Sequence, residues 1–160
     1  MCAEQKPRAE IPLSPKEAAQ YSPLALAFLG DCIYERLVRE RILLEANRPA
    51  RAMHDAAVSR VRAAYQAKAV EHILPLLTEE ESDIYRRGRN ASGISVPRHA
   101  TPADYRKATA LECLFAYWHL CGAAERIHQM FSIIWDEVPL YEESDALQQE
   151  AAEEASTQNI

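Results

Sequence analysis

The sequence has no run of about 18 apolar residues free of charge, so it offers no candidate membrane-spanning helix. Its first ten residues, MCAEQKPRAE, lack the basic-then-apolar order of a signal peptide, and we therefore expect a soluble, cytoplasmic protein. Only four of the 160 residues are glycine, which argues against turn-rich β-sandwiches and barrels. What remains is a single all-α domain, long enough to bury one hydrophobic core.

The four cysteines include no C-x-x-C pair and no matching histidine cluster, which argues against a zinc site. Cys32, Cys113 and Cys121 fall in apolar helical patterns, where a reduced cysteine packs as a small hydrophobic residue. Because disulfides are rare in the cytosol, we expect these three to be free thiols.

The net charge of −6 hides an uneven distribution of 18 basic and 24 acidic residues. Residues 136–160 contain eight of the acids and no Lys or Arg, so residues 1–135 keep 18 basic against 16 acidic residues. Within that part, residues 85–107 carry six basic residues and one acid, a local charge of +5. A polyanion responds to this local charge rather than to the total, so nucleic-acid binding is compatible with the sequence.

Capping residues and prolines predict about seven helices. Ser14 and Thr78 each begin a capping box, Pro15 occupies a first helical position, and Gly122 suits a C-terminal cap. The predicted helices cover residues 15–21, 23–46, 50–69, 70–77, 79–90, 102–121 and 123–138.

Three parts of the chain follow from this pattern. Residues 1–22 form an N-terminal segment with the first helix, and residues 23–138 form the main domain, with one long loop at 91–101. Residues 139–160 have few large apolar side chains, so we expect an acidic, disordered tail.

Two acids stand in apolar helical surroundings, Asp31 in LALAFLGDCIYERLV and Glu112 in ATALECLFAYWHL. An unpaired buried charge costs several kcal/mol, so each carboxylate needs a partner. One interpretation is a structural acid that caps a helix or pairs with an arginine. Two such acids together with a basic loop favour a divalent cation, and oxygen ligands suit Mg²⁺, with Mn²⁺ as the alternative.

The motifs around these acids resemble the ribonuclease III family. Residues 28–31, F-L-G-D, resemble the core of its signature helix, and residues 109–112, T-A-L-E, resemble its second metal-binding helix, D-T-F-E-A. Residues 87–91, R-G-R-N-A, are similar to a motif of the compact Mini-III branch. Pro97, Tyr105-Arg106 and Thr109 follow in the order of that branch's pattern. The resemblance runs from about residue 23 to residue 130.

The chain also departs from the patterns of the family. Ala27 stands where full-length ribonuclease III has a glutamate, and Thr109 where it has an aspartate, as is characteristic of Mini-III. Of the metal-binding carboxylates that the resemblance implies, only Asp31 and Glu112 are therefore present. Against the Mini-III pattern, three further positions differ: His99 for Asn, Lys107 for Tyr and Leu111 for Phe.

The resemblance implies an all-helical, homodimeric endonuclease that cleaves double-stranded RNA with Mg²⁺, with Asp31 and Glu112 as catalytic and metal-binding residues. It implies hydrolysis to 5′-phosphate and 3′-hydroxyl ends, with precursor 23S ribosomal RNA as the typical substrate. With only 22 residues after Val138, we expect no double-stranded-RNA-binding domain to follow. The cleavage position, the number of metals, the role of the tail and any need for a ribosomal protein stay open.

Other residues are assigned by charge and by position. Phe28 occupies the position that enters the partner subunit in ribonuclease III, and packing within its own subunit is the competing interpretation. Glu35, one turn after Asp31, either assists at the metal site or pairs with Arg39. The predicted RNA-binding residues are Arg86, Arg87, Arg89, Asn90, Arg98 and Lys107.

Two other functions stay in view. The first is a catalytically silent ribonuclease III-like module that binds RNA or the ribosome, against which the presence of both Asp31 and Glu112 argues. The second is an all-α nucleotide pyrophosphohydrolase, which needs clustered E-x-x-E pairs on adjoining helices that the sequence does not supply around Asp31.

Overall fold

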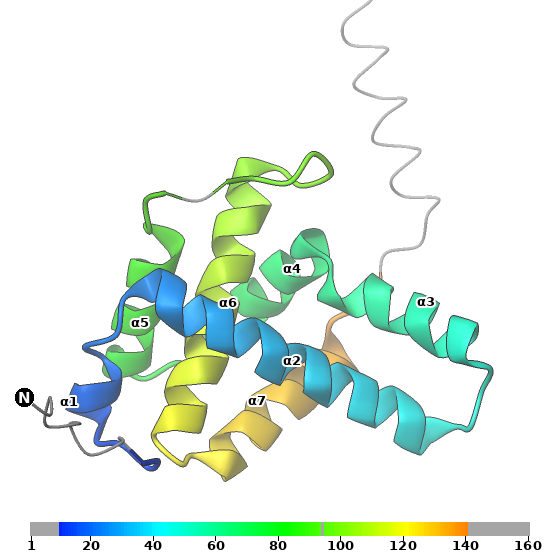
Figure 1. The fold of residues 1–160 in the computed structure, drawn as a ribbon, viewed down its shortest axis with the longest axis horizontal. Helices are drawn as coiled ribbons and strands as arrows, with labels where there is room; N and C mark the ends of the chain where they lie inside the picture. Colours follow the sequence, from blue (N-terminus) through cyan, green and yellow to red (C-terminus); the bar gives the residue numbers. More distant parts are fainter. Residues whose placement is uncertain (1–9, 94, 141–160) are drawn as a thin grey trace, which may run out of the picture.

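The fold was analysed in a computed structural model, which describes residues 10–93 and 95–140. These residues form seven α-helices and one short 3₁₀ turn, with no strand among them, which confirms the all-α prediction (Figure 1). The helices are α1 (Pro15–Ala18), α2 (Pro23–Glu45), α3 (Ala50–Val61), α4 (Ala63–Ile73), α5 (Glu79–Arg89), α6 (Pro102–Leu120) and α7 (Ala124–Glu137), and the 3₁₀ turn is Leu74–Leu76.

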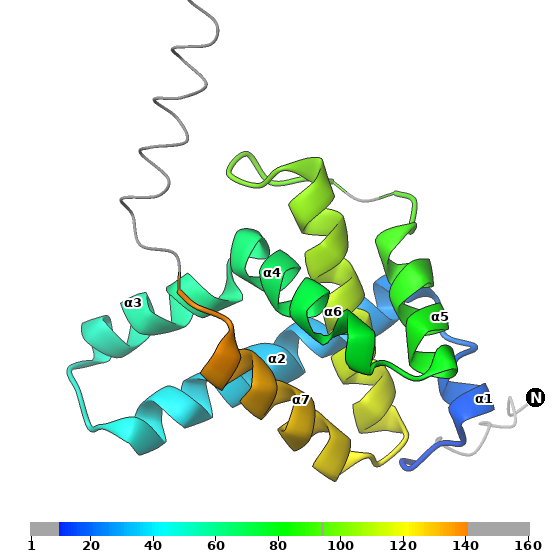
Figure 2. The same ribbon diagram turned by 180° about the vertical axis from the view of Figure 1, so that it is seen from behind.

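Helix α6 is the centre of the fold. It is apolar on nearly all sides, with ten buried residues that include Leu111, Leu114, Phe115 and Trp118. A helix of that kind must be surrounded by others, and α2, α4 and α5 pack against it from different directions (Figures 1 and 2). Asp31 on α2 and Glu112 on α6 therefore lie on two helices that are in direct contact.

Two glycines allow neighbouring helices to approach the backbone of α6. A Cβ atom at Gly30 of α2 would lie 1.7 Å from the carbonyl oxygen of Glu112, and one at Gly88 of α5 would lie 2.8 Å from Cα of Ala110. Any side chain at either position would hold the helices apart. The glycine of the F-L-G-D motif thus sets the α2–α6 crossing, which brings Asp31 beside Glu112.

The predicted helix ends agree with the structure where local capping decides them. Ser14 and Thr78 form both predicted capping boxes, and Gly122 has the left-handed φ of 68° expected of a C-terminal cap. The described residues of the loop at 91–101 form no helix, as predicted. The first helix is shorter than predicted and ends at Ala18.

The predicted helices 50–69 and 70–77 are wrong in their boundaries. The chain breaks at Arg62, whose ψ of 148° is extended, and a new helix begins at Ala63. This change of direction lets α4 bury Tyr65, Ala69 and Val70 in the core. No proline or glycine marks the break, so packing rather than local sequence determines it.

Some predictions concern parts of the chain that the structure describes only in part. Of the acidic tail predicted at 139–160, residues 141–160 lie outside the described residues, as do residues 1–9 of the N-terminal segment. None of the helices in the described ranges combines the length and apolar character needed to cross a bilayer. Cys113 is buried and Cys121 is half-buried, as expected for small hydrophobic residues, whereas Cys32 is exposed on α2; all three are free thiols.

Candidate active site

Asp31 and Glu112 line one pocket of about 490 Å³. Asp31 reaches it from α2 and Glu112 from α6, Arg62 lies at the α3–α4 break, and Gln66 comes from the first turn of α4. The loop that follows α5 closes another side with Pro97 and His99. The structure thus brings together the two acids that the sequence singled out separately.

The two carboxylates are not paired with a basic side chain in the described part of the protein, although Arg62 lines the same pocket. Among the described residues, Asp31 and Glu112 take part in no ion pair with Lys, Arg or His. Burial and the negative charge of Asp31 raise the pKa of Glu112 to about 8, against a weaker opposing effect of a hydrogen bond from Gln66. Burial and the charge of Glu35 likewise raise the pKa of Asp31. The interpretation of these acids as structural ion pairs finds no support in these contacts.

Gln66 is a site residue that the sequence analysis missed. Its side chain lies in the same pocket and is 2% exposed, and its Nε2 donates to the Val61 carbonyl oxygen at 2.8 Å. Its Oε1 has no hydrogen-bond partner within the described part of the chain. An uncharged polar residue between Tyr65 and Ala67 was the signal available, but the helix predicted across 50–69 gave it no place in a site.

The donor set of the pocket suits a hard divalent cation. Two carboxylates and one unpartnered amide oxygen offer oxygen atoms only, which Mg²⁺ and Mn²⁺ prefer. The raised pKa of Glu112 indicates that the pair of acids lacks a positive charge, which a bound cation would supply. The described residues contain no group of three His, Cys, Asp or Glu side chains placed to share a metal. The two acids are therefore the whole carboxylate set that this pocket offers.

Glu35 pairs with Arg39, as one of the two interpretations proposed. Its Oε1 accepts a hydrogen bond from Nε of Arg39 at 2.8 Å, on the exposed side of α2. Its charge is close enough to raise the pKa of Asp31, but its carboxylate does not line the pocket of Asp31 and Glu112. This geometry therefore does not support a metal-binding role for Glu35.

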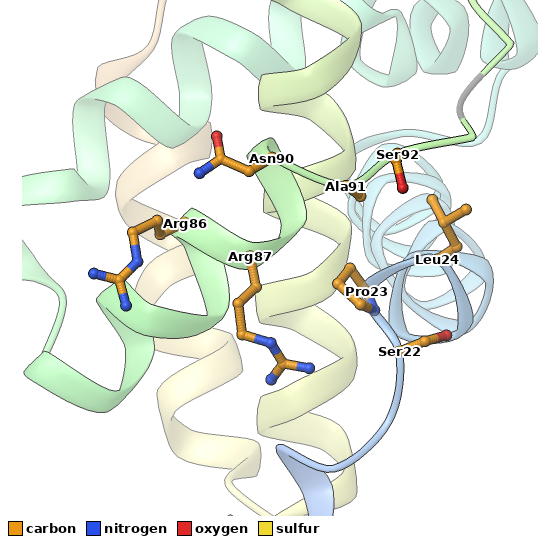
Figure 3. A pocket seen from close by; sticks show the side chains of 8 residues that line it. All are labelled: Ser22, Pro23, Leu24, Arg86, Arg87, Asn90, Ala91 and Ser92. Atoms are coloured by element: carbon orange, nitrogen blue, oxygen red, sulfur yellow. The ribbon is translucent and has the colours of Figure 1, made fainter.

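Arg87 is committed to the protein's own backbone. Its two terminal nitrogens donate to the carbonyl oxygens of Ala19 at 2.6 Å and Tyr21 at 2.9 Å, on the connection between α1 and α2. Figure 3 shows the Arg87 side chain pointing from α5 toward this connection, with Arg86 pointing another way. Arg87 therefore ties the chain before α2 to α5.

The other predicted RNA-binding residues differ in how strongly they are engaged. Arg86 is exposed and pairs with Asp83 at 2.7 Å, whereas Lys107 is half-buried and bound to Glu71. The exposed Arg89 and Asn90 lie at the end of α5, with the Arg89 guanidinium 5.6 Å from the centre of the Tyr85 ring. Arg98 is exposed in the loop beside Pro97 and His99, which line the pocket of the acids.

A second pocket, of about 470 Å³, separates the start of α2 from the end of α5 (Figure 3). The end of α5 and the residues after it line this pocket with Arg86, Arg87, Asn90 and Ser92, and the start of α2 lines it with Ser22, Pro23 and Leu24. The predicted basic segment therefore adjoins both pockets.

Phe28 does not pack within its own subunit. It is 86% exposed on α2, one turn before Asp31 and one turn after the 41% exposed Leu24. Exposed Cys32 continues the same face. This decides against core packing, one of the two interpretations of Phe28, and leaves an apolar helix face that needs a partner.

The family model and the sequence relatives of this chain point to one family. Residues 24–123 match the family model of the ribonuclease III domain. The chain is 50% identical over 114 residues to the Mini-ribonuclease 3 of a Synechococcus species, which covers 71% of this chain and 81% of that protein. It is 37% identical over 142 residues to the Mini-ribonuclease 3 of Desulfitobacterium hafniense, covering 89% and 90% of the two chains. A crystal structure of a Fusobacterium nucleatum protein superposes with a TM-score of 0.66 at 32% identity, covering 72% of this chain and 92% of that one.

Proposed function

This chain belongs to the ribonuclease III family, in its Mini-ribonuclease 3 branch, and we propose on that basis that it is an endoribonuclease acting on double-stranded RNA. The observation that carries the proposal is the convergence in one pocket of Asp31 and Glu112, neither of which forms an ion pair with another described residue. The reaction is phosphodiester hydrolysis, giving 5′-phosphate and 3′-hydroxyl ends.

Asp31 and Glu112 would hold a divalent cation, with Mg²⁺ as the expected ion and Mn²⁺ as a substitute. When bound, the cation supplies Lewis-acid stabilisation of the phosphodiester and offsets the repulsion between the two carboxylates. The chain's own contribution is to orient these carboxylates: the close α2–α6 crossing at Gly30 fixes the spacing of the helices that carry them.

Exposed basic residues beside the site would hold the RNA backbone. Arg89, Asn90 and Arg98 are free of bonds to distant parts of the described structure, and Arg86 pairs only with its neighbour Asp83 on α5. Arginine donates two parallel hydrogen bonds to a phosphate, so these side chains suit the role. Lys107 can take part only by exchanging Glu71 for a phosphate, and Arg87 only by releasing the backbone of residues 19 and 21.

We propose that the active unit is a homodimer. Its two subunits would contact each other through the exposed face of α2 that carries Leu24, Phe28 and Cys32. A phenylalanine that is 86% exposed is costly in water, and a two-fold contact would cover it on both subunits. Two sites in one dimer would cut the two strands of a duplex. The Mini-III resemblance supports precursor 23S ribosomal RNA as the substrate and the cytoplasm as the location, with a ribosomal protein as an optional partner.

A catalytically silent binding module is the second candidate. An inert module has no need for two unpaired, half-desolvated carboxylates, which cost stability where they stand. A nucleotide pyrophosphohydrolase would need clustered carboxylates on adjoining helices. Among the described residues, only Glu112 joins Asp31 from another helix, and the acids that share its second pocket, Glu35 and Glu40, lie on α2 itself and pair with Arg39 and Arg36.

The test is incubation of the protein with a long RNA duplex, with Mg²⁺ or with EDTA, followed by gel analysis. Cleavage of the duplex only with Mg²⁺ is the expected result. Binding of the duplex without cleavage in Mg²⁺ or Mn²⁺ would favour the silent module, and hydrolysis of free nucleoside triphosphates would favour the pyrophosphohydrolase.

A further inference from the structure

The start of α4 borders the pocket that holds Asp31 and Glu112. Arg62, Ala63 and Gln66 all line this pocket. Arg62 is the N-cap residue of α4, with an extended ψ of 148°, and the helix runs for 11 residues from Ala63. The N-terminal turn of a full helix therefore lies at the two acids.

The N–H groups of this turn are unused. Arg62 gives α4 no side-chain cap, and the N–H groups of Ala63 and Ala64 donate to no other described residue. The first N–H groups of a helix have no partner within the helix, so they are normally bonded to a cap, to water or to a ligand. Together with the positive end of the helix dipole they suit an anion such as a phosphate.

Arg62 adds a full positive charge at the same place. Its side chain is exposed and forms no ion pair with the other described residues, the two acids of the pocket included. Its backbone is held on both sides, because its N–H donates to the Val58 carbonyl oxygen at 3.2 Å and its own carbonyl oxygen accepts from the Gln66 N–H at 3.1 Å. A guanidinium on a backbone anchored in this way is well placed to donate two parallel hydrogen bonds to a phosphate.

The side chain of Gln66 gives independent evidence that a ligand binds at this turn. It is 2% exposed, and its Nε2 donates to the Val61 carbonyl oxygen at 2.8 Å, which leaves Oε1 without a partner in the described structure. A buried acceptor without a donor costs free energy, so we expect a partner from outside the chain. Beside two carboxylates, the partner that this oxygen suits is the divalent cation, for which amide oxygens are ordinary ligands. The cation would then lie against the first turn of α4.

We propose that the first turn of α4 holds the phosphodiester that is cleaved, beside the cation. Gln66 Oε1 is the third protein ligand of the cation, and Arg62 binds the phosphate together with the N–H groups of Ala63 and Ala64. The proposal rests on the proposed function, because it assumes both the cation and an RNA substrate. Fixed donors at this position stabilise the negative charge that develops on the phosphate oxygens during hydrolysis.

Variants of this turn should fall into two classes. Arg62→Gln and Ala63→Pro remove donors to the phosphate, so each should slow duplex cleavage at saturating Mg²⁺ about 100-fold, the usual cost of losing one such donor. Their affinity for Mn²⁺, measured without RNA by calorimetry or electron paramagnetic resonance, should equal that of the wild type. Gln66→Met removes the amide oxygen at similar side-chain length and should weaken Mn²⁺ binding at least about 10-fold.

Ala63→Pro is compatible with the fold. Proline is favoured at the first position of a helix, and Arg62 already has the extended conformation that a residue before proline prefers. Ala50→Pro is the matched control: Ala50 is the first residue of α3, which also lacks a side-chain cap, it follows a residue with a ψ of 142°, and it does not line the pocket. This control should cleave at the wild-type rate.

Binding of duplex RNA supplies a second measurement for Arg62, in the inactive Asp31→Asn background. Arg62→Gln should reduce the slope of log affinity against log salt by roughly one unit, as expected for one lost phosphate contact. Arg51→Gln, the same change at an exposed position of α3, should leave the slope unchanged. The Arg62 variant decides the outcome by itself if Ala63→Pro does not fold.

The outcomes separate this inference from the proposed function. If the wild type cleaves duplex RNA with Mg²⁺ while Arg62→Gln and Ala63→Pro cleave as fast as their controls, the phosphate site is overturned and the proposed function stands. Weakened Mn²⁺ binding in these two variants, or wild-type Mn²⁺ binding in Gln66→Met, would also overturn it, because the turn would then not divide its contacts between phosphate and cation. If the wild type cleaves no duplex RNA, the proposed function fails and the phosphate site fails with it.

Discussion

Gly30 and Glu112 touch through their backbones: a Cβ atom on Gly30 would lie 1.7 Å from the Glu112 carbonyl oxygen. This contact joins α2 to α6 at the position next to Asp31. The site geometry therefore depends on the absence of a side chain as much as on the two acids.

Gly30→Ala should consequently destabilise the protein by about 3 kcal/mol, the upper end of the usual cost of overpacking, because the obstacle is backbone and cannot rotate away. Thermal or urea unfolding measures the loss. Gly93→Ala is the comparison, since a Cβ there meets nothing within 4 Å and only its φ of 79° is unfavourable. That variant should lose only about 1 kcal/mol. Equal losses in the two variants would contradict a close α2–α6 contact at Gly30.

The metal-free protein should become less stable as the pH rises from about 5 to about 8. Glu112 has a pKa of about 8 in the folded protein against an ordinary 4.5, so below pH 4.5 it is protonated in both states. Between these values the unfolded chain ionises while the folded one keeps its proton, and the free energy of unfolding falls.

Melting temperatures across this pH range in EDTA test the titration of Glu112. Glu112→Gln should flatten the part of the pH dependence that this group causes. Added Mg²⁺ should oppose the loss of stability at high pH, because the cation binds the ionised form. A variant with the same pH dependence as the wild type would show that another group titrates.

Local sequence could predict the parts of this fold that local interactions decide. We could predict the caps at Ser14 and Thr78 because their hydrogen-bond partners lie three residues away. The apolar surroundings of Glu112 could be predicted because its neighbours in sequence are apolar. The break at Arg62 was not readable, since only the packing of α4 against α6 requires it.

The candidate site likewise combines residues that the local sequence reveals with residues that only the packing reveals. Asp31 and Glu112 could be found because a carboxylate in an apolar helix is conspicuous, and the resemblance to ribonuclease III paired them. The role of Arg87 could not be found, because its two carbonyl partners lie 66 and 68 residues away in sequence. Gln66 depends on the unpredicted break and escaped notice for that reason.

Arg89→Ala and Arg98→Ala should each weaken binding of duplex RNA in a catalytically inactive Asp31→Asn background. Each lost phosphate contact should reduce the slope of log affinity against log salt by roughly one unit. Arg51→Ala, an exposed arginine on α3, is the control and should leave both affinity and slope unchanged. Binding curves for the Arg89 and Arg98 variants that superimpose on the control would place the RNA elsewhere.

Arg87→Ala should behave differently from these variants. It removes two hydrogen bonds to the backbone before α2, so we expect a loss of about 1–2 kcal/mol in the free energy of unfolding. The salt dependence of RNA binding should stay close to that of the wild type. A reduced slope without a loss of stability would instead make Arg87 a phosphate contact.

Phe28→Ala should weaken the proposed homodimer, because it removes the most exposed large apolar side chain of the α2 face. Light scattering over a micromolar concentration range should show dimers for the wild type and a shift to monomers for the variant. Leu76→Ala, which truncates an exposed leucine away from α2, should remain dimeric. A wild type that is monomeric at these concentrations and still cleaves both strands would refute the dimer.

The most direct measurement of the central claim is cleavage of an RNA duplex by Asp31→Asn and Glu112→Gln in saturating Mg²⁺. Both changes keep the shape of the side chain and remove its charge, and circular dichroism verifies that the fold is retained. Asp55→Asn, the same change at an exposed position of α3, controls for the substitution itself. If Asp31 and Glu112 hold the cation, both variants fall to the level of the wild type in EDTA while Asp55→Asn stays fully active. Wild-type rates in either site variant would contradict the assignment.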